Sequence, residues 1–106
     1  MRSEVAAVLA RGQFPASENI TPSEVDTWGE LIDAIPMPVS DDEAKALVGV
    51  LGPDDLFGLA FSIRRLVESA PSWPIWSVLV GPSPWIDDLR ERARNSGYHP
   101  PDDGLA

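Results

Sequence analysis

The chain has 106 residues, enough for one hydrophobic core. Its 17 acidic and 8 basic residues give a net charge of -9, which argues against binding to free nucleic acid or to an anionic membrane surface, since both require clustered Lys and Arg. The absence of cysteine excludes disulfides, thiol catalysis and thiolate metal sites.

Two helices are predicted in the first third of the chain. The apolar spacing of residues 3–11 followed by Gly12 predicts a short helix with a glycine stop. Residues 12–20 form a connector. A second helix is expected over 21–35, because Thr21 can cap it, Pro22 suits the first helical position and Glu24 completes a capping box.

The middle of the chain predicts two more helices. Ser40 and Glu43 repeat the capping-box pattern ahead of an apolar stripe that ends at Gly52. The longest helix is expected over 53–70, opened by Pro53 and two aspartates. Apolar side chains cover most of its circumference, which places it at the centre of a bundle.

The last third of the chain is less regular. Residues 71–84 are rich in tryptophan and proline, and a strand, an extended buried segment and a short helix all fit them. A final helix is expected over 84–95, and residues 98–106 read as a loose polar tail. The whole chain therefore predicts an all-α fold, a single-domain bundle of about five helices with an extended Trp/Pro-rich segment at 71–84.

The charge is unevenly distributed along the chain. No basic residue lies between Arg11 and Lys45, whereas eight acidic residues do. Several of these occupy expected first turns of helices, where the helix dipole favours an anion. Asp26, Glu30 and Asp33 have no such explanation: they share one helical face, where like charges repel. They are either an ordinary solvated face or a surface that meets a basic partner.

Two tryptophans beside prolines are the candidate apolar contacts. Trp73 and Trp85 each lie at the edge of a segment. Trp is enriched at binding hot spots, but it also fills gaps in small cores. If a tryptophan is exposed as a binding anchor, we expect it to be one of these two.

The sequence predicts no catalytic residue, no metal site and no cofactor. The only histidine, His99, falls in the expected tail, where it is not held against a substrate. The aspartate pairs lack calcium-loop spacing. No run of apolar residues is long enough to span a bilayer, so the expected location is the cytoplasm.

Residues 54–74, which begin Asp54-Asp55-Leu56-Phe57-Gly58, resemble a segment of small acidic bacterial proteins of the toxin-immunity type. The resemblance covers about twenty residues and carries no site residue with it. It is not tied to a defined activity, and it favours the interpretation as an immunity protein.

Three functions follow as hypotheses. The first is an immunity-type or antitoxin-like protein that neutralises a basic partner, such as a toxin or a nuclease, through Asp26, Glu30 and Asp33 with Trp73 or Trp85 as apolar anchors. The second is a structural or scaffold subunit that self-associates through apolar surface near 73–86. The third is a small enzyme without a recognisable motif.

Overall fold

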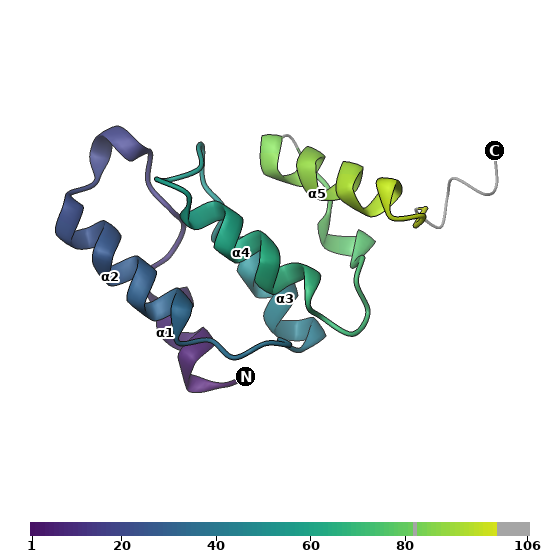
Figure 1. The fold of residues 1–106 in the computed structure, drawn as a ribbon, viewed down its shortest axis with the longest axis horizontal. Helices are drawn as coiled ribbons and strands as arrows, with labels where there is room; N and C mark the ends of the chain where they lie inside the picture. The colour runs from purple at the N-terminus through teal and green to yellow at the C-terminus, as the bar shows by residue number, and fades with distance from the viewer. Residues whose placement is uncertain (82, 100–106) are drawn as a thin grey trace. The chain divides into compact units, whose positions relative to one another are not determined.

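The computed structural model describes residues 1–81 and 83–99, and these form an all-α fold, as predicted (Figure 1). No strand occurs within these residues. The helices are α1 (Ser3–Ala10), α2 (Pro22–Asp33), α3 (Asp41–Val48), α4 (Leu59–Glu68) and α5 (Pro84–Asn95), with 3₁₀ turns η1 (Ser17–Asn19) and η2 (Trp76–Val78). The chain divides into two compact units, Met1–Trp73 and a second that begins at Pro74, and each is described by itself.

Two helices begin where the sequence predicts, and for the predicted reason. At the start of α2, the Thr21 side chain accepts from the backbone N–H of Glu24, whose carboxylate accepts from the backbone of Thr21. Ser40 and Glu43 form the same capping box at the start of α3. Each box satisfies backbone donors that a helix otherwise leaves without partners.

The first unit packs four helices around one core. The last of them, α4, packs against α3 and α2, and α1 packs against the same two helices (Figure 1). On α2, Trp28 and Ile32 are buried, as their helical spacing predicts. Apolar residues from all four helices are buried, and those with no exposed surface include Val5, Ala44, Leu47 and Ile63.

The connector between α1 and α2 contributes to this core in a way that the sequence does not predict. Phe14 is buried and its ring meets that of Trp28 edge to face, with centroids 4.9 Å apart. Its backbone N–H donates to the carbonyl of Val50 over 2.8 Å. The contact is so close that Gly52, which lies against the Phe14 backbone, has no room for a side chain.

The predicted helix over 53–70 is wrong in its first turns, because α4 begins only at Leu59. Asp54 does not cap a helix: its carboxylate accepts from the backbone N–H and hydroxyl of Ser17 and from the backbone N–H of Leu56. Leu56, Phe57 and Gly58 then all have positive φ, at 45°, 55° and 89°. A helix cannot pass through such residues.

The second unit contains η2 and α5. Residues 71–84 form no strand where they are described; of the options that the sequence left open, a short helix is realised over Trp76–Val78. The last helix, α5, occupies Pro84–Asn95, as predicted. The Arg90 guanidinium donates to the carbonyl of Leu79 over 2.8 Å and lies over the Trp76 ring, which ties η2 to α5. Of the predicted tail, Tyr98 and His99 are exposed, and residues 100–106 lie outside the described residues.

Candidate functional site

The three acidic residues singled out on α2 are all on the surface. Asp26, Glu30 and Asp33 are exposed, and their positions in the helix place them on one face. Within residues 1–81 and 83–99, none of the three carboxylates forms an ion pair or a hydrogen bond. We call this set the acidic face of α2. Its charge is directed to solvent.

Basic residues come close to α2 without neutralising this face. Arg11 places its guanidinium over the Trp28 ring, 5.1 Å from the centroid. Arg65, on α4, lines the same pocket of about 200 Å³ as Asp33, but the two form no ion pair. The positive charge of Arg65 therefore weakens the negative electrostatic potential near Asp33. The negative potential of the face is least offset at Asp26 and Glu30.

Other acidic residues of the first unit are, in contrast, part of its internal structure. Hydrogen bonds from Ser72 lower the pKa of Asp41, and those from Ser17 and Leu56 lower the pKa of Asp54. Both carboxylates hold backbone segments in place. They accept these hydrogen bonds in their charged form, which is why protonation is disfavoured.

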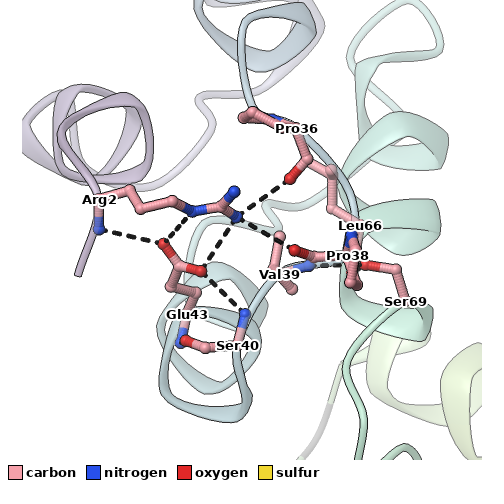
Figure 2. Close-up of polar contacts among 8 residues, drawn as sticks. All are labelled: Arg2, Pro36, Pro38, Val39, Ser40, Glu43, Leu66 and Ser69. Carbon is pink, nitrogen blue, oxygen red and sulfur yellow. Dashed lines mark hydrogen bonds and ion pairs between the residues drawn. The ribbon is translucent and has the colours of Figure 1, made fainter.

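Glu43 is the most deeply placed of these acids. It is 2% exposed, and its carboxylate accepts from the backbone N–H of Arg2 and from the Arg2 guanidinium, at 3.1–3.2 Å (Figure 2). Hydrogen bonds from Arg2, followed by that from the Ser40 backbone, lower the pKa of Glu43 to about 2. The same guanidinium donates to the carbonyls of Pro36 and Pro38. An open pocket of about 590 Å³ adjoins this pair, but its charged groups already satisfy each other.

The two candidate tryptophans differ in exposure. Trp73 is half-buried at the end of the first unit, and its backbone N–H donates to Ala70. Trp85 is only 9% exposed, in the first turn of α5, so it does not present its ring at the surface as a binding anchor would. Its apolar ring is used in packing, as is usual for Trp in a small core. Trp73 alone retains exposed area for a partner.

A pocket that the sequence does not predict adjoins the acidic face. It measures about 290 Å³ and is lined by Ile20, Pro22, Val25, Asp26 and Phe57. Val25 is half-buried and lines this pocket. Phe57 is 66% exposed. The one signal for it in the sequence is Gly58, which is costly inside a helix and marks the turn that presents Phe57.

Within the described ranges, no group of three or more acidic, histidine or cysteine residues is placed to hold a metal ion. No helix among those described is long and apolar enough to cross a membrane. No family model, no curated protein and no solved structure matches the chain.

Proposed function

We propose that this chain is an acidic binding protein that docks a basic partner protein on the acidic face of α2. The observation that carries the proposal is that Asp26, Glu30 and Asp33 are exposed and without an ion pair in the described structure, although other acids of the same unit are held by internal contacts. Like charges at this spacing repel one another by a few tenths of a kcal/mol. A cationic partner relieves that repulsion.

The role that fits such a surface is that of an immunity-type or antitoxin-like inhibitor acting in the bacterial cytoplasm. Three carboxylates on one helix face resemble a row of phosphates, so they suit a protein whose own ligand is a nucleic acid, such as a nuclease toxin. The segment 54–74, which resembles proteins of this type, contains the turn at 56–58 that lies beside α2 through the pocket at Asp26. Trp73 is the candidate apolar contact at the end of that segment.

The test uses the full chain as bait in a lysate of its host. The first variant combines Asp26→Asn, Glu30→Gln and Asp33→Asn. The matched control removes three exposed charges elsewhere, with Asp42→Asn, Asp87→Asn and Glu91→Gln. We expect the unmodified chain and the control to retain the same basic protein, and the α2 variant to lose it.

The purified pair then gives the rate of association. Charge steering predicts that the rate falls steeply with salt, and that the α2 variant slows it by about tenfold or more at low ionic strength. A partner retained equally by the α2 variant, with a rate indifferent to salt, would contradict the proposal.

Self-association is the second candidate, and exposed apolar side chains favour it. Phe57, Phe61 and Val80 are 66%, 45% and 67% exposed. Val80 lies in the 73–86 region proposed for self-association, whereas the two phenylalanines lie outside it. Sedimentation at micromolar concentration separates the candidates, because a stable homodimer supports a scaffold and a monomer supports a binding protein.

A further inference from the structure

Beside the acidic face of α2 lies the pocket of about 290 Å³ that Ile20, Pro22, Val25, Asp26 and Phe57 line. Four of the five are apolar, and the fifth is the exposed Asp26. The volume lies just below the roughly 300–1,000 Å³ typical of small-molecule sites. It suits a protein side chain better than a whole cofactor.

Phe57 is held at this pocket at a cost to the fold. Its φ of 55° is in the left-handed region, which is unfavourable by about 1–2 kcal/mol for a residue with a Cβ. Burial of the Phe57 side chain does not offset this strain, since the side chain is 66% exposed. Leu56 shares the positive φ but is fully buried, so packing accounts for it. Strain that packing does not explain is characteristic of functional positions.

The charge beside the pocket specifies what enters it. Asp26 lines the pocket and Glu30 follows one helical turn along the same face, and neither carboxylate has an ion pair within the described residues. A side chain that fills the pocket therefore has anionic neighbours on one side. An occupant with an apolar side chain next to a Lys or Arg satisfies both parts of the surface.

We propose that this pocket is the anchor site for a partner segment that carries a large apolar side chain flanked by lysine or arginine. The apolar side chain packs on Phe57 and Val25, and the flanking cation pairs with Asp26. This inference rests on the proposed function and adds a specificity element to it: the acidic face attracts basic proteins, and the pocket selects among them.

The test is a titration of the full chain with synthetic peptides, followed by NMR. The first peptide alternates lysine with leucine, and the second replaces every leucine with serine. We expect the first to bind more tightly by on the order of tenfold, as for a hot-spot side chain. The NMR chemical shift changes that the first peptide causes in the chain should be largest at Val25, Asp26 and Phe57.

Variants separate the pocket from the charge. Phe57→Gly removes the aromatic wall with a residue that tolerates the positive φ, and Phe57→Asn serves as a second such variant. Both should abolish the preference for the leucine peptide and leave the serine peptide unaffected. Phe61→Ala, which removes another exposed aromatic outside the pocket, should change neither.

The possible failures are distinguishable. If the serine peptide binds as well as the leucine peptide and Phe57→Gly has no effect, the pocket proposal is overturned while the acidic face stands. If the α2 variant with Asp26→Asn, Glu30→Gln and Asp33→Asn binds both peptides with unchanged affinity, the proposed function fails as well. If sedimentation shows a homodimer that Phe57→Gly dissociates, a second copy of the chain covers the pocket and the proposed occupant is wrong.

Discussion

Arg2 and Glu43 are 41 positions apart in the sequence, yet three donors of Arg2 converge on the Glu43 carboxylate (Figure 2). Glu43 also completes the capping box of α3, and Arg2 reaches the carbonyls of Pro36 and Pro38. A single ion pair therefore holds the start of α1, the start of α3 and the segment that precedes α3.

Arg2→Ala should destabilise the first unit substantially, because it leaves a buried carboxylate without its cation. The Glu43 carboxylate is 2% exposed, so water cannot replace the hydrogen bonds that it would lose, although the Arg2 side chain is itself 38% exposed. Arg65→Ala, which removes an exposed arginine of α4 that forms no ion pair with Asp33, is the control. Urea unfolding of both variants checks this. Equal midpoints for the two would show that the pair contributes little.

Stability should fall in acid because of Glu43. Its pKa in the folded chain is about 2, below the ordinary value of 4.5, so its contribution is fully present above pH 4.5 and is lost as the pH falls toward 2. The lowered pKa values of Asp41 and Asp54 act in the same direction.

Glu43→Gln isolates this contribution. The variant should be less stable at pH 7, and its stability should decline less steeply between pH 4.5 and 2 than that of the unmodified chain. Glu24→Gln, at the equivalent capping-box position of the exposed α2 start, is the control and should retain the full slope. Parallel slopes for Glu43→Gln and the unmodified chain would contradict the assignment.

Two glycines should respond to alanine in opposite ways. At Gly52, a Cβ would overlap the carbonyl oxygen of Phe14 and lie 2.9 Å from the Phe14 Cβ. At Gly29, in the middle of α2, the nearest atom is the Leu59 Cδ2 at 3.7 Å. We expect Gly52→Ala to destabilise by roughly 1–3 kcal/mol, and Gly29→Ala to stabilise by about 0.5–1 kcal/mol through helix propensity. Thermal unfolding of both variants checks the signs.

Arg90→Ala should loosen the second unit. The substitution removes the hydrogen bond to Leu79 and the stacking on Trp76. Amide exchange at Val78 and Leu79, whose N–H groups donate to Ile75 and Trp76, should then accelerate by about tenfold, the equivalent of one charged hydrogen bond. Glu91→Ala, an exposed neighbour on α5, should leave this exchange unchanged.

The parts of the fold that local chemistry determines are predictable from the sequence. The capping boxes at Thr21 and Ser40 and the Ser83-Pro84 start of α5 need only residues within one helical turn, and each helix begins where they place it. The exposure of Asp26, Glu30 and Asp33 follows from the opposite face being apolar.

The features that the sequence does not predict depend on distant partners. Asp54 has the pattern of a helix start, but Ser17 binds its carboxylate and the chain turns instead. The positive φ at Phe57, and with it the pocket beside Asp26, occurs in the turn that replaces the predicted start of the helix. Arg90 likewise has its partner outside its own helix, at the Leu79 carbonyl. Local patterns cannot reveal competition of this kind.

The turn that presents Phe57 can be tested without any partner. At Gly58, φ is 89° and an added Cβ would meet open space. Gly58→Ala therefore introduces only the strain of a positive φ, and it should destabilise the fold by about 1–2 kcal/mol. At Phe57 the expected effect on stability has the opposite sign. Phe57→Gly relieves the same kind of strain and gives up little burial, so its stability should be unchanged or up to about 1 kcal/mol higher. Urea unfolding measures both. A marked loss of stability in Phe57→Gly would mean that Phe57 is held by packing, and the reason to regard it as a binding residue would disappear.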